Sequence, residues 1–196
     1  MTLDILVRAL AETAGITTGG VLVTRAYGRL FLAELDIVLH KVPIETVVLL
    51  DFDGVEIMDA SFVDEVFRTV AARNAKRVGL RHYLLLQRLS SHLLENLDIT
   101  LSSRPQRERG LRNCVLPFVD PEGQVKLVGK AEGHVYETFD LLRTRRRLNA
   151  RDVADAFDVE IHAASVRLKV LHDLCLATRT EKHEVHGKQF IYLWPF

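Results

Sequence analysis

The chain has little cysteine: of its 196 residues only Cys114 and Cys175 are cysteines, and both lie among apolar neighbours. Their separation fits neither a zinc ligand pair nor a redox dithiol, so neither a disulfide framework nor a cysteine metal site is predicted. Buried, reduced thiols are the remaining interpretation, and these are typical of proteins in a reducing cytosol.

The sequence also lacks a net charge, because 26 Lys and Arg balance 26 Asp and Glu. This balance argues against nucleic-acid binding through bulk positive charge, but it leaves a local basic patch open. No apolar run approaches the ~20 residues that cross a bilayer. Residues 1–15 lack the basic start and continuous apolar core of a signal peptide. The chain is therefore predicted to be soluble and cytoplasmic, without a membrane partner.

Apolar runs and helical patterns alternate through the first half of the chain. Helical spacing of apolar residues is found over residues 2–13, 26–40, 61–73 and 84–97. Strands are expected over residues 21–23, 46–51, 76–80 and 99–101. Strands that alternate with helices of this length imply βαβ units, so the pattern predicts an α/β fold with a mainly parallel sheet.

A change of composition follows this region. Residues 102–113 are polar and basic and are predicted to form a loop. Extended runs over 114–119 and 124–128 flank an Asp-Pro-Glu-Gly turn, which predicts a β-hairpin. We expect the hairpin to join two domains. The expected division is an α/β domain over 1–113, a hairpin connector over 114–130 and a second domain over 131–196.

The most informative stretch is Val47–Phe67, which reads VVLLDFDGVEIMDASFVDEVF. A buried strand ends in Asp51-Phe-Asp53-Gly54, and Asp59-Ala-Ser61 then opens a helix. This pattern resembles the STAS and STAS-like domains, the fold of the bacterial anti-sigma-factor antagonists. The helix start at Thr24-Arg25 is similar to the STAS-like branch. The resemblance covers roughly residues 17–115 and implies a protein-interaction domain whose partner is a kinase or an anti-sigma-like protein.

The resemblance also marks a candidate regulatory residue. In the antagonists the second Ser of the motif is phosphorylated by an anti-sigma kinase, and Ser61 stands at that position. Asp59 and Phe62 are the candidate partner contacts beside it. A structural alternative stays open, because Ser61 with Asp64 three residues later also fits a helix N-cap.

The pattern changes again from residue 131. Helices are expected over 134–142, 150–157 and 162–174, followed by strands over 176–179 and 189–193. Helix, helix, turn, helix and hairpin is the element order of a winged helix. The stretch 150–177 resembles winged-helix transcriptional regulators, and the resemblance spans about residues 133–196. It implies a small α+β domain that presents its third helix outward.

Double-stranded DNA is therefore a candidate partner of the second domain. Polar and cationic residues before, within and after the third helix are the candidate DNA contacts: Arg143, Arg145, Arg146, Arg147, Ser165, Arg167, Lys169, Lys182 and Lys188. Three apolar residues of the third helix, Ile161, Val166 and Val170, are unusual on a face that meets DNA. They favour protein contact or homodimerisation instead, and both alternatives stay open.

No catalytic arrangement stands out in the sequence. A nucleophile with its base and a phosphate-binding glycine loop are not found, and His183 with His186 lacks a further metal ligand. The chain is therefore predicted to be a non-enzymatic regulator without cofactor or metal. The leading hypothesis is a transcriptional regulator whose STAS-like domain receives a protein signal and whose winged helix acts on DNA. The alternative is an adaptor or partner-switching antagonist in which both domains bind protein.

Overall fold

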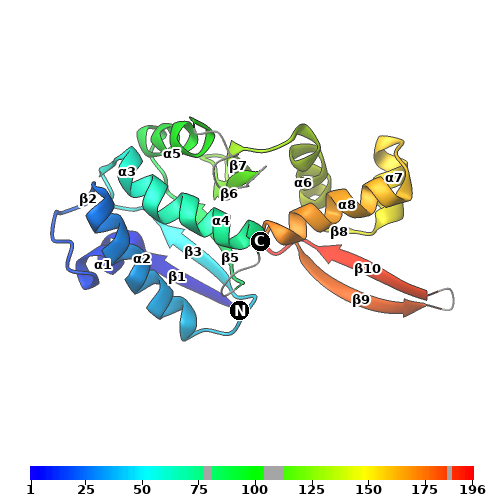
Figure 1. The fold of residues 1–196 in the computed structure, drawn as a ribbon, viewed down its shortest axis with the longest axis horizontal. Coiled ribbons are helices and arrows are strands. Elements are labelled where there is room, and N and C mark those ends of the chain that lie inside the picture. The colour runs from blue at the N-terminus through cyan, green and yellow to red at the C-terminus, as the bar shows by residue number, and fades with distance from the viewer. Residues whose placement is uncertain (77–80, 104–112, 185–186) are drawn as a thin grey trace. The chain divides into compact units, whose positions relative to one another are not determined.

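The computed structural model describes residues 1–76, 81–103, 113–184 and 187–196. The chain forms two compact units, Met1–Lys130 and Ala131–Phe196 (Figure 1). Among the described residues, no helix has both the length and the apolar character needed to cross a bilayer.

The N-terminal unit is built on a five-stranded, mainly parallel sheet with the order β1-β3-β5-β6-β7. Strands β1, β3, β5 and β6 run parallel, and β7 is antiparallel to β6. The bounds are β1 Thr2–Leu6, β3 Val47–Asp51, β5 Tyr83–Gln87, β6 Cys114–Val119 and β7 Val125–Lys130. An α/β fold with a mainly parallel central sheet is thus confirmed.

Helices cover one face of this sheet. They are α1 Val7–Thr13, α2 Arg25–His40, a continuous helical segment made of α3 Ala60–Val63, η1 Asp64–Arg68 and α4 Thr69–Lys76, and α5 Ser91–Ser103. Because each parallel strand lies beside the previous one, right-handed crossovers place successive helices on the same side. The core lies between them: Ile5, Val48, Leu50 and Leu86 of the strands pack with Phe31, Leu35 and Phe67 of the helices.

The first segment departs from the sequence-based expectation of one helix over residues 2–13. Residues Thr2–Leu6 form β1, which pairs with β3 from Thr2↔Val47 to Leu6↔Asp51, and the helix begins only at Val7. The segment fits the apolar spacing of a helix and also that of a strand, because Leu3, Ile5 and Val7 alternate with more exposed residues. Because its backbone pairs with the buried strand β3, the segment forms a strand and not a helix.

The leucine-rich segment is a second correction. A helix was expected over 84–97 and a strand over 99–101, but residues Tyr83–Gln87 form β5 and residues Ser91–Ser103 form α5. Continuous leucines suit a strand between β3 and β6 as well as they suit a helix. Of the strand expected over 76–80, Lys76 ends α4 and residues 77–80 lie outside the described residues.

The expected hairpin is confirmed as β6 and β7, which pair from Cys114↔Lys130 to Val119↔Val125. Asp120 holds its turn: Oδ1 accepts from Gln124 N at 2.7 Å, and Lys126 Nζ lies 2.6 Å from Oδ2. This ammonium group keeps the pKa of the Asp120 carboxyl below its usual value. The hairpin completes the central sheet, so its expected role as a separate connector over 114–130 was wrong. Residues 104–112 of the loop expected over 102–113 lie outside the described residues, and residues 102–103 end α5.

The C-terminal unit contains three helices and a three-stranded antiparallel sheet with the order β8-β10-β9. Its elements are α6 Gly133–Arg145, β8 Arg147–Leu148, α7 Ala150–Phe157, α8 Ile161–Asp173, β9 Thr178–Glu184 and β10 Gly187–Leu193. Buried side chains from all three helices make the core, among them Phe139, Leu142, Val153, Leu168 and Leu171. The three expected helices and two expected strands are confirmed within a few residues.

Candidate functional site

Two short parallel strands bring the starts of α2 and α3 together. Val21 and Leu22 of β2 pair with Ile57 and Met58 of β4, and each strand leads directly into a helix. Close backbone packing permits this, since a Cβ on Gly20 would lie 2.3 Å from the carbonyl oxygen of Gly54. Gly20 also has a φ of 104°, which favours glycine. Residues far apart in the sequence therefore meet at one end of this unit.

The carboxylate of Asp59 joins the two helix starts. Its Oδ1 accepts from Phe62 N at 2.7 Å, and its Oδ2 accepts from Thr24 N at 3.0 Å. Thr24 caps α2 with a φ of 73°, an uncommon conformation for a β-branched residue. The N-cap of α3 is thus Asp59, and the expected capping role of Ser61 was wrong. Asp59 is half-buried and has a structural task.

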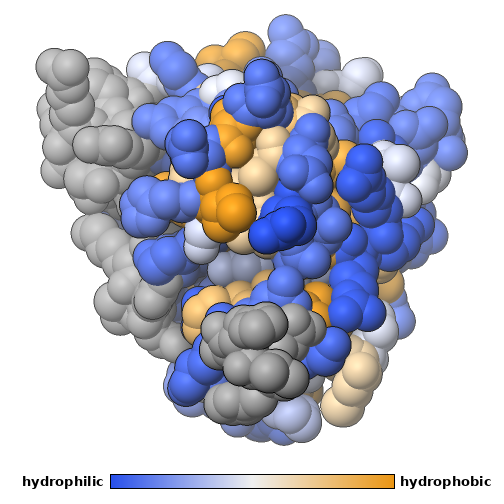
Figure 2. All heavy atoms as spheres, turned by 90° about the vertical axis from the view of Figure 1, so that its right-hand side faces the viewer, coloured by the Kyte–Doolittle hydropathy of each residue, from blue (hydrophilic) through white to orange (hydrophobic). Residues whose placement is uncertain are grey.

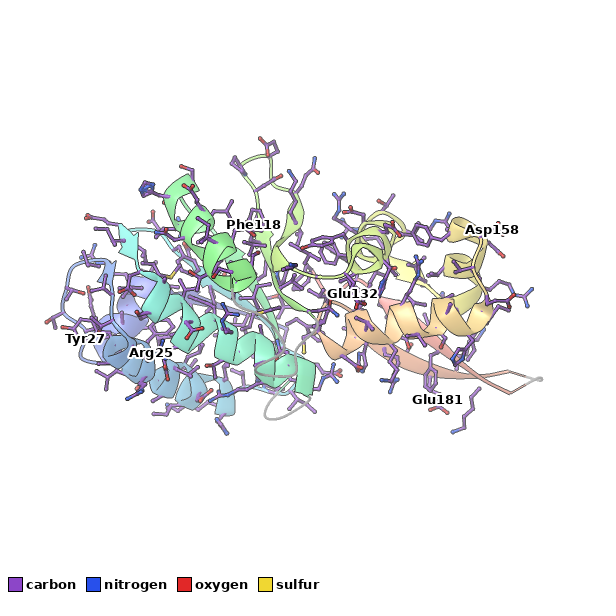
Figure 3. All side chains as sticks on the ribbon, turned by 45° about the horizontal axis from the view of Figure 1, so that its top comes forward. Arg25, Tyr27, Phe118, Glu132, Asp158 and Glu181 are labelled. Carbon is purple, nitrogen blue, oxygen red and sulfur yellow. The ribbon has the colours of Figure 1, made fainter. Side chains whose placement is uncertain are left out.

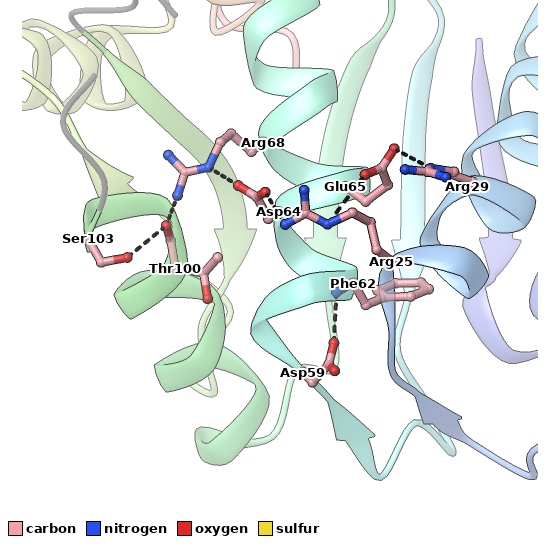
Figure 4. Close-up of polar contacts among 9 residues, drawn as sticks. All are labelled: Arg25, Arg29, Asp59, Phe62, Asp64, Glu65, Arg68, Thr100 and Ser103. Carbon is pink, nitrogen blue, oxygen red and sulfur yellow. Dashed lines mark hydrogen bonds and ion pairs between the residues drawn. The ribbon is translucent and has the colours of Figure 1, made fainter. Parts of the chain in front are cut away.

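A network of charged side chains lies beside this junction (Figure 4). Asp64 accepts from Arg68 Nε at 2.6 Å and from Arg25 Nη2 at 3.2 Å. Arg68 also donates to the carbonyl oxygen of Thr100 in α5. Glu65 extends the network, with Arg25 Nε at 3.9 Å and Arg29 Nε at 3.5 Å. Three elements, α2, η1 and α5, are thereby tied together.

Burial differs sharply along this network. The side chains of Asp64 and Arg68 are only 5% and 6% exposed, whereas that of Arg25 is 42% exposed. The buried pair lies in a π-helical turn, and such turns occur frequently at functional sites. Of the two arginines that contact Asp64, Arg25 is the accessible one; it lies at the first turn of α2, where Figure 3 labels it beside Tyr27.

Ser61 lines a pocket of about 240 Å³ with these residues. The pocket wall combines two guanidinium groups and one carboxylate with three hydroxyl side chains and two apolar ones: Arg25, Ala60, Ser61, Asp64, Arg68, Ile99, Thr100 and Ser103. The lining carries one more positive than negative charge. Its chemistry suits an anionic group attached to, or brought against, the Ser61 hydroxyl.

Phe62, expected as a partner contact, is a core residue. Its side chain is 0% exposed. Its ring meets Phe31 edge-on at 5.5 Å between centroids and lies 6.5 Å from Phe67. The apolar group that does border the pocket is Ile99 of α5, which is 56% exposed and which the sequence did not indicate.

At the ends of β3 and β5, Asp51 and Asp53 form a separate, structural cluster. Asp51 accepts from Arg88 Nε at 2.6 Å and from Asp53 N at 3.0 Å. Arg88 Nη1 also lies 3.7 Å from the Asp53 carboxylate. Asp51 thus holds the turn that follows β3.

In the C-terminal unit, many expected DNA contacts are already paired with local carboxylates. The N–O distances are 3.2 Å for Arg143–Asp140, 3.3 Å for Arg167–Glu137, 3.0 Å for Lys169–Asp173 and 2.8 Å for Lys188–Glu181. Arg167 also lies over the ring of Phe157, with its Cζ 5.2 Å from the centroid. These pairs leave the cations in place but reduce the positive potential that phosphates would meet.

The arginine run spans the end of α6 and the start of β8. Arg143 and Arg145 belong to α6, Arg146 takes a left-handed conformation after it, and Arg147 begins β8. Arg146 lies over the ring of Trp194 at 5.6 Å and donates to the carbonyl oxygen of Phe196. Arg145 and Arg147 are exposed and make no ion pair with another described residue.

The third helix of this unit exposes apolar surface. Ile161 and Val166 of α8 are 51% and 46% exposed, while Val170 and Ser165 are half-buried. Figure 2 shows hydrophobic side chains gathered on this end of the unit and surrounded by hydrophilic ones. At the wing, Lys182 is exposed, whereas His186 and the side chain of His183 lie outside the described residues.

The sequence comparisons assign neither site. No protein-family model and no curated protein matches this chain. The two sites consequently rest on their own geometry. Sequence reasoning found Ser61 and Asp59 but missed Arg25, Arg68 and Thr100 as their neighbours. The signal for Arg68 was present, since Asp64 and Arg68 are four residues apart in a helical pattern.

Proposed function

We propose that this chain is a non-enzymatic regulator with a STAS-like protein-interaction domain and a DNA-binding winged helix. The observation that carries the proposal is the junction of α2 and α3, where Ser61 shares a pocket with Arg25 and Arg68. The C-terminal unit supports it with its order of helix, strand, helix, helix and hairpin. The partner of the first domain is a kinase or an anti-sigma-like protein, and that of the second is duplex DNA.

A phosphate on Ser61 would act through Arg25. It would add −1.5 to −2 charges to a pocket that now carries about one positive charge. Arg25 is the exposed cation there, and its present contact with Asp64 is 3.2 Å long, against 2.6 Å for Arg68 with Asp64. The phosphate would draw Arg25 away from the carboxylates and reverse the sign of the surface that a partner meets.

Co-expression with an ATPase-type kinase from the same genome tests this site. We expect intact-mass measurement to show a species heavier by one phosphate, and Ser61→Ala to abolish it. Ser103→Ala is the matched control, because Ser103 lines the same pocket and should leave the modification intact. An unmodified wild-type chain, or a Ser61→Ala chain that still gains the phosphate, contradicts the proposal.

DNA binding is expected to depend on Arg145 and Arg147, two exposed arginines near the start of α7. Fluorescence polarisation with a random duplex should show affinity that falls linearly on a log–log plot against salt. Arg145→Ala with Arg147→Ala should weaken binding and make that slope shallower by about 2. Lys169→Ala is the control, because Lys169 is already paired with Asp173 at 3.0 Å and should change the slope less.

Protein contact by the C-terminal unit is the second candidate function. The exposure of Ile161 and Val166 on α8 favours it, as do the ion pairs that occupy Arg167 and Lys169. If the chain ignores duplex DNA at low salt, the adaptor hypothesis replaces the DNA-binding one. If Val166→Glu leaves DNA binding unchanged while the double variant Arg145→Ala with Arg147→Ala abolishes it, the exposed face of α8 is not the DNA contact.

A further inference from the structure

Helix α2 carries a second apolar face that points away from the core. Ala26, Leu30, Ala33 and Ile37 are all exposed, and Leu30 and Ile37 are each 48% exposed. Their separations of four, three and four residues place them within an arc of about 60° on a helix that turns about 100° per residue. The buried residues Phe31, Leu35 and Leu39 lie on the opposite side.

This arrangement is unusual for a helix at the surface. A surface helix normally has one apolar stripe toward the core and polar residues opposite it, whereas a helix that is apolar on both sides is normally covered on both. Intervals of four and three residues are those of a coiled-coil seam. The alternation of alanine with Leu30 and Ile37 leaves room for two such helices to approach closely and interdigitate.

We propose that α2 pairs in parallel with α2 of a second copy of this chain. The charged residues on both sides of the exposed apolar stripe (Ala26, Leu30, Ala33 and Ile37) favour a second copy of the chain in this orientation as the partner. In parallel pairing, a residue on one flank faces the residue five positions later on the other flank of the partner helix. Arg29 would then face the partner's Glu34, and Asp36 would face the partner's Lys41. Both pairs join opposite charges, and two-fold symmetry repeats each of them.

The flanking side chains are accessible for this role. The Arg29 side chain is 70% exposed, and its contact with Glu65 in the single chain is a long 3.5 Å. Asp36 is half-buried and already forms an ion pair with Arg73, whose Nη1 lies 2.7 Å from its Oδ1. Its pairing with the partner's Lys41 is therefore weaker than the pairing of Arg29 with the partner's Glu34. The pairing goes beyond the proposed function, because it does not require that Ser61 be modified or that DNA be bound.

Sedimentation equilibrium of the full chain tests the pairing. We expect a concentration-dependent monomer–dimer equilibrium, and Leu30→Glu with Ile37→Glu should leave only monomer. Ile44→Glu with Ile57→Glu is the matched control, because these exposed isoleucines lie outside the stripe and should not change the dimer. Far-UV circular dichroism should show that all variants remain folded.

Charge reversal separates this geometry from nonspecific apolar association. Glu34→Lys alone should weaken dimerisation about fivefold, because it places an ammonium group opposite the partner's Arg29. Adding Arg29→Glu should restore it. A wild-type chain that is monomeric up to about 1 mM overturns the inference. So does a dimer that ignores both the stripe and the charge reversal, since its interface would lie elsewhere.

Discussion

Replacing Asp64 with alanine is expected to lower the free energy of unfolding by about 3–5 kcal/mol. The change leaves the guanidinium group of Arg68, only 6% exposed, without the carboxylate that lies 2.6 Å from its Nε. An uncompensated buried charge is strongly destabilising, because the protein interior solvates it poorly. Urea unfolding followed by far-UV circular dichroism measures the loss.

Two comparisons make this result specific. Glu65→Ala removes the neighbouring carboxylate, which is 22% exposed and contacts arginines at 3.5 Å and 3.9 Å, so it should cost less than about 1 kcal/mol. Arg68→Leu added to Asp64→Ala should recover part of the stability, because no buried charge then remains. Equal losses for the two single carboxylate variants would show that the Asp64–Arg68 pair does not behave as a buried one.

Phe62→Ala is expected to cost about 3–5 kcal/mol, because it empties a site that is 0% exposed among Phe31 and Phe67. Urea unfolding again gives the measurement. Ile57→Ala, which truncates a side chain that is 50% exposed, should cost less than about 1 kcal/mol. If Phe62→Ala kept full stability but lost a protein partner, the original interpretation of Phe62 as a contact residue would be right.

The fold could be predicted where the spacing of apolar residues matched either a helix or a strand, but not both. The strand Val47–Asp51 and the helix Arg25–His40 are continuous patterns bounded by turn residues, and both form as expected. The hairpin of β6 and β7 has an explicit turn sequence. Errors fell on β1 and β5, whose leucines satisfy helical and strand patterns alike. Long-range pairing with β3 decides both, and no local pattern encodes it.

The site could be predicted only in part for the same reason. Ser61 and Asp59 stand in one contiguous motif, so the sequence indicated both. Arg25 lies 39 residues before Asp64, and Thr100 lies 32 residues after Arg68; they meet through β2–β4 pairing and through helix packing. The fate of Phe62 was hidden because a phenylalanine in a helical pattern gives no sign of which neighbours will cover it. Pairing of Arg167 with Glu137 in another helix was hidden in the same way.

The π-helical turn at Asp64–Arg68 has an evolutionary consequence. Such a turn holds one residue more than a regular helix of equal length, so it can accommodate a single-residue insertion without breaking the helix. Deleting one residue there would restore a regular α-helix, in which the segments on both sides of the turn keep the orientation that they have now. Ser61 would then keep its orientation relative to Val70 and Ala71, which anchor α4 in the core. The turn is therefore a place where this helical segment can gain or lose a single residue without turning the core residues of α4 away from the sheet.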